Sequence, residues 1–271
     1  MIGMAIAAAN GITIGYDDRG DPDGVPLVLV HGHPFDRTMW APQSTRFAAA
    51  GYRVITADLR GYGESQVVPG ITPLEVFARD TAALMDHLGV SRAVVGGLSM
   101  GGQIVMEFYR LFPHRAAGLV LADTFPRAET EEGKAVRNAM ADRLLREGMA
   151  GYADEVIAKM VAPYNVGALP GVAAQVLRMM RTTSPAGAAA ALRGRAERPD
   201  YRALLGQVTV PALVVVGADD EYTPVSDTEE MHGRLPHSTL AVIEGAAHMP
   251  NLERPEEFDA ALAAFLEQLP R

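Results

Sequence analysis

The stretch Gly97-Leu98-Ser99-Met100-Gly101 decides how this chain folds. It follows a short apolar run, Ala93 to Gly96, and precedes a segment with apolar residues at helical spacing, Gly102 to Phe112. A serine between glycines at a strand-to-helix junction is typical of a nucleophile elbow, where the glycines make room for a strained turn. The helix start also brings amides close to developing negative charge. The stretch predicts a serine nucleophile; the alternative is a glycine-rich turn with a solvent-facing serine.

Short apolar, β-branched runs lie on both sides of this stretch, as strands buried on both faces should. They are Leu27 to Val30, Val54 to Ala57, Ala93 to Gly96, Leu119 to Ala122, Leu213 to Val216 and Leu240 to Ile243. Helical patterns separate most of them, at Met39 to Ala50, Pro73 to Leu88, Gly102 to Phe112, Val225 to Leu235 and Pro255 to Leu269. This alternation predicts a parallel sheet with helices on both faces.

Two segments break the alternation. Residues Met4 to Ala8 and Ile12 to Tyr16 flank Asn10-Gly11 and predict an opening β-hairpin. Roughly 80 residues from Thr124 to Gln207 have no strand-like run, which is too long for a loop. Helical patterns fill this interval at Glu129 to Arg146, Tyr152 to Val161, Val172 to Arg181 and Ala186 to Glu197. We expect a core domain of residues 1–123 and 207–271, and an inserted helical cap of residues 124–206 that covers a pocket at the carboxyl ends of the strands.

Composition excludes several classes of function. The 271 residues contain no cysteine, which rules out disulfides, iron–sulfur clusters, thiolate zinc sites and a cysteine nucleophile. A net charge of −9 repels polyanions, so nucleic acid is not an expected partner, and it weighs against a strongly anionic substrate. No apolar run reaches about 18 residues and no basic segment precedes the apolar start. We therefore expect a cytoplasmic protein that does not bind membranes and acts on a small molecule.

A serine nucleophile needs a base, normally a histidine that a carboxylate orients. In this kind of fold the order along the chain is serine, acid, histidine. Asp220 follows the predicted strand that ends at Val216, and His248 follows the last predicted strand, so both should reach the same sheet edge as Ser99. We predict Ser99, Asp220 and His248 as the catalytic residues.

Two other carboxylates compete for the role of the acid. Asp219 is adjacent to Asp220, and Asp123 lies at the end of a core strand in a position that also faces the site. We interpret Asp219 as a turn residue and Asp123 as a helix-cap carboxylate.

The oxyanion hole requires two backbone amides. Met100, directly after the serine, supplies the first. The second should come from the loop after the strand that ends at Val30. There Gly32 permits close approach and Pro34 has no amide, which leaves His33 as the main-chain donor. Phe35 is the alternative donor, and we expect it to contribute to substrate binding.

A metal site is the competing interpretation of this loop. His31 and His33 are spaced as His-x-His, but no nearby Asp–His pair extends them and no cysteine is available. We therefore predict no metal.

Taken together, these residues resemble the α/β-hydrolase superfamily. Beyond the elbow, the resemblance rests on His31-Gly32, Asp58-Leu59-Arg60-Gly61-Tyr62-Gly63-Glu64-Ser65, Asp220-x-x-Thr223-Pro224, and His248 followed by Glu253-Arg254-Pro255-Glu256. The resemblance implies an eight-stranded, mostly parallel sheet, a Ser–Asp–His triad and no cofactor. Within the superfamily the chain looks most like small esterases, enol-lactonases and cofactor-free haloperoxidase-type perhydrolases.

Some positions depart from these relatives. His33 stands where many of them carry an aromatic or aliphatic residue, so the pocket either accepts a polar group or leaves this histidine exposed at its rim. Relatives that dehalogenate or open epoxides use an aspartate nucleophile, against which Ser99 argues. We interpret Asp58 to Ser65 as a structural loop. Methionines of the cap form its core or line an adaptable apolar pocket; they include Met140, Met149, Met160, Met179 and Met180.

The sequence therefore predicts a carboxylesterase-like serine hydrolase that cleaves a small ester through an acyl-enzyme. Lactone opening, hydrolysis of a C–C bond and perhydrolysis would use the same triad. An acyltransferase and a non-catalytic ligand-binding module are the remaining alternatives.

Overall fold

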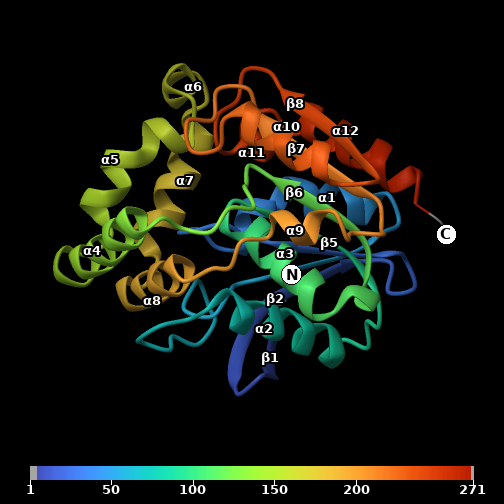
Figure 1. Cartoon of the computed structure of the whole chain (residues 1–271), viewed down its shortest axis with the longest axis horizontal. Coiled ribbons are helices and arrows are strands. Elements are labelled where there is room, and N and C mark those ends of the chain that lie inside the picture. Colours follow the sequence, from blue (N-terminus) through green and yellow to red (C-terminus); the bar gives the residue numbers. More distant parts are fainter. Residues whose placement is uncertain (1–4, 270–271) are drawn as a thin grey trace.

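Eight strands form one sheet in the computed structural model, which describes residues 5–269. The strands are β1 (Ala5–Ala9), β2 (Ile12–Gly20), β3 (Pro26–Val30), β4 (Arg53–Ala57), β5 (Ala93–Leu98), β6 (Ala116–Ala122), β7 (Ala212–Gly217) and β8 (Ser238–Ile243). They lie in the order β1-β2-β4-β3-β5-β6-β7-β8 (Figure 1). The predicted sheet of eight mostly parallel strands is confirmed.

The two antiparallel pairings are β1 with β2 and β2 with β4, and the remaining pairs are parallel. The predicted hairpin turns at Asn10 and Gly11, both of which have positive φ. Its second strand is longer than predicted, because Asp17 to Gly20 continue to pair with β4. Polar residues are tolerated there since this end of the strand is partly exposed. Met4, where the first strand was predicted to begin, lies outside the described residues.

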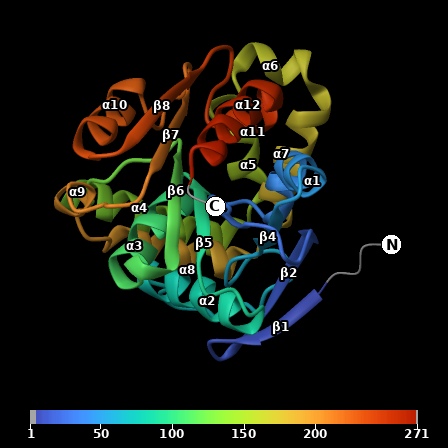
Figure 2. The same ribbon diagram turned by 90° about the vertical axis from the view of Figure 1, so that its right-hand side faces the viewer.

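Helices cover both faces of the sheet (Figure 2). One face packs against α2 (Leu74–His87), α3 (Met100–Leu111) and α10 (Val225–Arg234), and the other against α1 (Ala41–Ala49) and α12 (Pro255–Glu267). The shorter helices are η1 (Arg37–Trp40), η2 (Pro113–Arg115), α9 (Arg202–Leu205) and α11 (Pro250–Glu253). The predicted helix at Met39 to Ala50 is thus a 3₁₀ turn followed by an α-helix.

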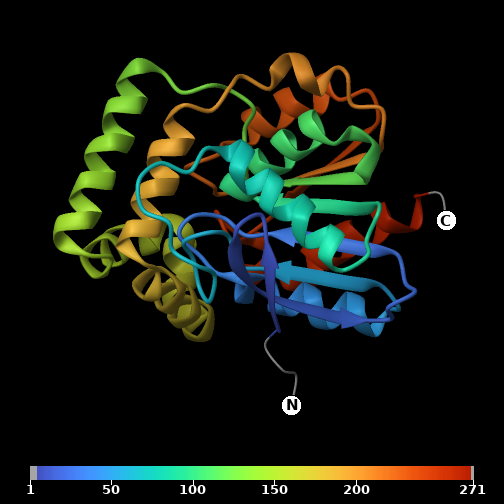
Figure 3. The same ribbon diagram turned by 90° about the horizontal axis from the view of Figure 1, so that it is seen from below.

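The interval between β6 and β7 is helical apart from short connections. It contains α4 (Glu131–Glu147), α5 (Ala150–Met160), α6 (Pro163–Ala168), α7 (Pro170–Thr182), α8 (Pro185–Ala196) and α9. Helices α4 to α8, called the inserted helices below, lie together at one end of the sheet (Figures 1 and 3). The sequence did not predict α6. Pro163 reads as a break, but it occupies the first turn of this helix, where its missing N–H has no cost.

Helix α8 touches the core through its backbone. A Cβ atom on Gly187 would lie 1.9 Å from the Gly61 carbonyl oxygen, and one on Gly194 would lie 1.7 Å from the Thr72 carbonyl oxygen. Between these points the Thr72 amide donates a 2.9 Å hydrogen bond to the Ala190 carbonyl. Only glycine permits such an approach, so the two glycines fix α8 against the loops before α2.

Within residues 5–269, no helix has both the length and the apolar character that crossing a membrane requires.

The contact between α8 and the core predicts the effect of one substitution. In Gly194→Ala the new methyl group must displace the Thr72 backbone, so we expect the free energy of unfolding to fall by about 1–3 kcal/mol, as in other overpacked sites. Urea unfolding measures this change. The matched control is Gly151→Ala at an exposed position of α5, where a Cβ atom meets nothing within 4 Å. We expect its stability to be equal or higher by up to about 1 kcal/mol; equal losses in both variants would contradict the steric explanation.

Candidate active site

Ser99 lies at the sharp turn between β5 and α3. Its backbone has φ 58° and ψ −116°, outside the regions that most residues adopt. The turn is tight because a Cβ atom on Gly97 would lie 2.3 Å from the Gly101 carbonyl, and one on Gly101 would lie 2.3 Å from the Val30 carbonyl oxygen. The Ser99 amide donates to the Ala122 carbonyl at 2.9 Å, which attaches the turn to β6. This is the geometry of the predicted elbow.

His248 and Asp220 form a hydrogen-bonded pair. Nδ1 of His248 lies 2.8 Å from Oδ2 of Asp220, and both side chains are buried. The other carboxylate oxygen of Asp220 accepts a 2.8 Å hydrogen bond from the Tyr222 amide. The turn that carries Asp220 follows β7, and the loop that carries His248 follows β8. A carboxylate on Nδ1 stabilises a proton there and leaves Nε2 as the basic nitrogen.

Ser99 and His248 line the same cavity, which has a volume of about 230 Å³. The structure therefore brings the predicted serine, acid and histidine to one place. Met160 on α5 also lines this cavity, whereas Met149, Met179 and Met180 are buried in hydrophobic clusters and do not belong to the cavity wall.

Asp123 occupies a different place from the predicted helix cap. Its side chain is fully buried, and Oδ1 accepts a 3.0 Å hydrogen bond from the Gly217 amide on β7. One carboxylate oxygen of Asp123, one of Asp220 and one ring nitrogen of His248 lie within 4.8 Å of one another. Burial, and next the charge of Asp220, raise the pKa of Asp123 well above its usual range. Asp123 therefore lies beside the Asp220–His248 pair as a buried carboxyl group whose pKa is raised.

Asp219 is the turn residue that the sequence predicts. Its amide donates to the Ala246 carbonyl at 3.0 Å, and its carboxylate accepts a hydrogen bond from the Tyr164 hydroxyl on α6. The hydrogen bond to Nδ1 of His248 comes from Asp220 and not from Asp219.

The loop after β3 leaves one candidate for the second oxyanion donor. The Phe35 amide donates to the Gly32 carbonyl at 3.0 Å and is therefore occupied. The amides of His33 and Met100 have no hydrogen-bond acceptor among the described residues. The Phe35 side chain is fully buried in the hydrophobic cluster around Leu98 and is not part of the cavity wall, so the predicted role of Phe35 in substrate binding does not fit its position.

The His33 side chain is buried and lines the cavity, which excludes the interpretation of an exposed histidine at the rim. Its Nδ1 lies 2.7 Å from the Tyr62 hydroxyl. This buried hydroxyl has no other partner in the described part of the chain, so it donates to Nδ1 and the ring proton sits on Nε2. Burial, and next the charge of Arg195, lower the pKa of His33 well below its usual value. His33 is therefore neutral, with an unpartnered Nε2–H donor.

His31 is occupied by structural contacts. Nδ1 lies 2.8 Å from the Gly32 carbonyl oxygen, and Nε2 accepts a 2.9 Å hydrogen bond from the Leu59 amide. Both ring nitrogens are used, so neither is available as a metal ligand.

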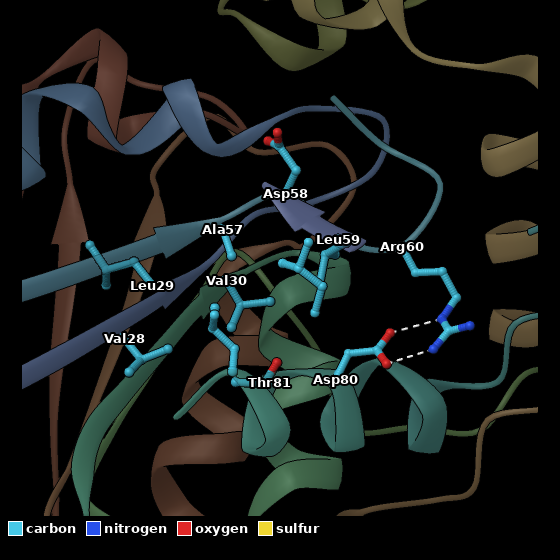
Figure 4. Close-up of a pocket in the computed structure, with 11 residues that line it drawn as sticks. Val28, Leu29, Val30, Ala57, Asp58, Leu59, Arg60, Asp80 and Thr81 are labelled. Carbon is cyan, nitrogen blue, oxygen red and sulfur yellow. Dashed lines mark hydrogen bonds and ion pairs between the residues drawn. The ribbon is translucent and has the colours of Figure 1, made fainter. Parts of the chain in front are cut away.

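The segment from Asp58 to Ser65 uses its polar groups inside the fold. The Asp58 carboxylate accepts from the Glu64 amide at 2.9 Å, and Arg60 forms an ion pair of 2.7 Å with Asp80 on α2. Figure 4 shows this ion pair beside a second cavity, on the face of the sheet that α2 covers. That cavity measures about 20 Å³, room for roughly one water molecule, so it does not suit a substrate.

Sequence reasoning missed the cavity residues outside the core motifs. They are Phe125, Arg137, Tyr152, Leu192, Arg195 and Tyr222. No spacing pattern singles out Arg137 and Arg195 among the scattered arginines of the inserted helices. The face that each of these helices turns toward the sheet edge depends on tertiary packing.

Known proteins share this architecture. A 3-oxoadipate enol-lactonase of Acinetobacter baylyi is 29% identical over 96% of this chain and 95% of its own. The structure of a thermophilic esterase from Thermogutta terrifontis, with malate bound, is 40% identical, with a TM-score of 0.93 over 98% of this chain and 97% of that one. The enol-lactonase from Burkholderia xenovorans LB400 is 27% identical, with a TM-score of 0.90 over 97% and 100%. The family model for the alpha/beta hydrolase fold matches residues 25–255, and the chain belongs to this family.

Proposed function

We propose that this protein is a serine hydrolase that cleaves small esters through an acyl-enzyme, with Ser99, His248 and Asp220 as its catalytic residues. The observation that carries the proposal is the 2.8 Å contact between His248 and Asp220 in the wall of the cavity that Ser99 also lines. The names of similar proteins, an esterase and enol-lactonases among them, support the same class of reaction.

The reaction begins when Oγ of Ser99 attacks the ester carbonyl and Nε2 of His248 takes its proton. Asp220 holds the imidazole in the correct tautomer and stabilises the positive charge. The tetrahedral intermediate collapses as the C–O bond breaks, and His248 protonates the departing alcohol. A water molecule then attacks the acyl-enzyme, gives its proton to His248, and releases the acid while Ser99 regains its proton.

The amides of His33 and Met100 stabilise the oxyanion in both halves of the reaction. The two amides have no other acceptor among the described residues, and that of Met100 is also at the N-terminus of α3, where the helix dipole favours negative charge. A donor of this kind contributes about 3–4 kcal/mol to the stability of a transition state.

A lactone is the second substrate type that the proposal covers, because it is an internal ester and opens by the same steps. The names of the enol-lactonases from Acinetobacter baylyi and Burkholderia xenovorans favour it. Comparison of kcat/KM on a panel of linear esters and lactones separates the two.

The nucleophile is tested with Ser99→Ala. We expect this variant to fold normally and to lose nearly all turnover of p-nitrophenyl butyrate, because no acyl-enzyme can form. A fluorophosphonate probe should label the wild-type protein at Ser99 and leave the variant unlabelled. Retained turnover together with labelling at another residue would refute the assignment of Ser99.

The acid is tested by a matched pair of variants. Asp220→Asn should lower kcat roughly 10⁴-fold, because an amide cannot hold the correct histidine tautomer. Asp123→Asn should retain activity within about tenfold, because burial and the charge of Asp220 raise the pKa of Asp123, and an amide is the analogue of its neutral form. Steady-state kinetics on the same ester measures both. The reverse pattern would assign the acid to Asp123.

A further inference from the structure

Two arginines from the inserted helices line the cavity that contains Ser99. Arg137 lies on α4 and Arg195 on α8, and the wall between them and the core includes His33. The catalytic steps above require neither arginine. Their positions therefore suit contacts with a group of the substrate that takes no part in the reaction.

Arg195 is buried without a negative partner. Its exposed fraction is 9%, and its Nε donates a 2.8 Å hydrogen bond to the neutral side chain of Gln103. Its other N–H groups have no hydrogen-bond or ion-pair partner in residues 5–269, whereas Arg137 and Arg198 each form an ion pair with Glu129. Burial, and next the charges of Arg137 and Arg198, lower the pKa of Arg195. An anion bound in the cavity would supply the opposite charge that the buried guanidinium of Arg195 lacks.

The charges around Arg195 do not balance. Glu129 is the carboxylate that both Arg137 and Arg198 contact, the latter at 3.0 Å. Although burial opposes ionisation, these two arginines lower the pKa of Glu129 to about 2, so it is ionised at neutral pH. One negative charge thus faces the three positive charges of Arg137, Arg195 and Arg198. The cluster has a positive excess on the side that faces the cavity.

His33 adds a neutral donor to the same wall. Its Nε2–H is buried, has no partner and belongs to a side chain of the cavity lining. The unpartnered groups of Arg195 and His33 are therefore hydrogen-bond donors, and a carboxylate offers the matching acceptors with the opposite charge to the arginine. Arginine is well suited to this task, since its planar guanidinium can bind a carboxylate through two parallel hydrogen bonds.

We propose that Arg195, with Arg137, binds a free carboxylate on the substrate, so that the preferred substrates are esters or lactones carrying a carboxylate group. The inference rests on the proposed serine hydrolase activity and specifies its substrate class. The net charge of −9 weighed against anionic substrates, but it is a sum over the whole surface, whereas binding depends on the charges next to the cavity.

The test compares substrates that differ in a carboxylate. One pair is p-nitrophenyl hydrogen glutarate and p-nitrophenyl pentanoate, with the charge on the acyl side. The other is 4-acetoxybenzoate and phenyl acetate, with the charge on the leaving group. We expect kcat/KM to favour the charged substrate at least about tenfold in one pair, since a hydrogen bond to a charged group contributes about 1.5–3 kcal/mol. Near-equal rates within both pairs would overturn the inference.

Variants then assign the preference to residues. In Arg195→Gln and Arg137→Gln, the ratio of kcat/KM between charged and neutral substrate should fall about tenfold, and Arg195→Lys should restore part of it. The matched control is Arg193→Gln, also on α8, whose side chain pairs with Asp142 at 2.6 Å outside the cavity wall. It removes the same charge and should keep the wild-type ratio. If this ratio falls equally in the control, the proposal that Arg195 and Arg137 contact the carboxylate directly is overturned. Thermal unfolding checks that each variant folds. If one of the two glutamine variants does not fold, the substitution of the other arginine still tests the proposal.

The two proposals fail in different ways. If wild-type protein hydrolyses neither member of either pair and no fluorophosphonate labels Ser99, the serine hydrolase assignment fails. If the wild-type protein hydrolyses the neutral esters and is labelled at Ser99, but shows no preference for the charged substrates, only the proposal of a carboxylate-binding site is refuted.

Discussion

The contact between the start of helix α3 and the end of strand β5 is the constraint on which the site depends. Side chains at Gly97 or Gly101 would occupy the space of the neighbouring backbone, so only glycine lets the chain reverse there. The reversal forces positive φ on Ser99 and points the start of α3 at the cavity. Because β3, β7 and β8 run parallel to β5 in the same sheet, the loops that follow them meet at the same edge. Asp220 and His248 lie on two of these loops.

The core was predictable because its signals are local. Buried parallel strands require continuous apolar runs, and the elbow requires its glycines, so both can be recognised without tertiary information. The position of Asp123 was not predictable in this way. A carboxylate that follows a strand suggests a cap or a catalytic acid. Only the packing against the neighbouring strand β7 shows that Asp123 is a buried carboxyl group beside Asp220, with its pKa raised by burial and by the charge of Asp220. Phe35 illustrates the same limit, since its loop position did not reveal that its side chain packs inward.

The cavity wall was the least predictable part. Four of the five inserted helices could be recognised by their periodicity, α6 being the exception, but Arg137 and Arg195 reach the same cavity through the packing of α4 against α8, which are separated by three other helices in the chain. The charge of the whole chain likewise does not predict the charge around the cavity. The chain is acidic as a whole, yet the immediate surroundings of Ser99 carry an excess of cations on one side. Composition describes the solvent-facing surface, which most charged residues occupy, and is silent about the few that face inward.

The two glycines of α8 limit how this member of the alpha/beta hydrolase family can change the shape of its cavity. Since the backbone of α8 already touches the core at Gly187 and Gly194, the helix can neither rotate about its axis nor approach more closely without a clash. Leu192 and Arg195, which face the cavity from the same helix, therefore stand at fixed positions. Adaptation to a new substrate would proceed by exchanging these side chains on an unmoving helix, which makes them natural positions for focused mutant libraries.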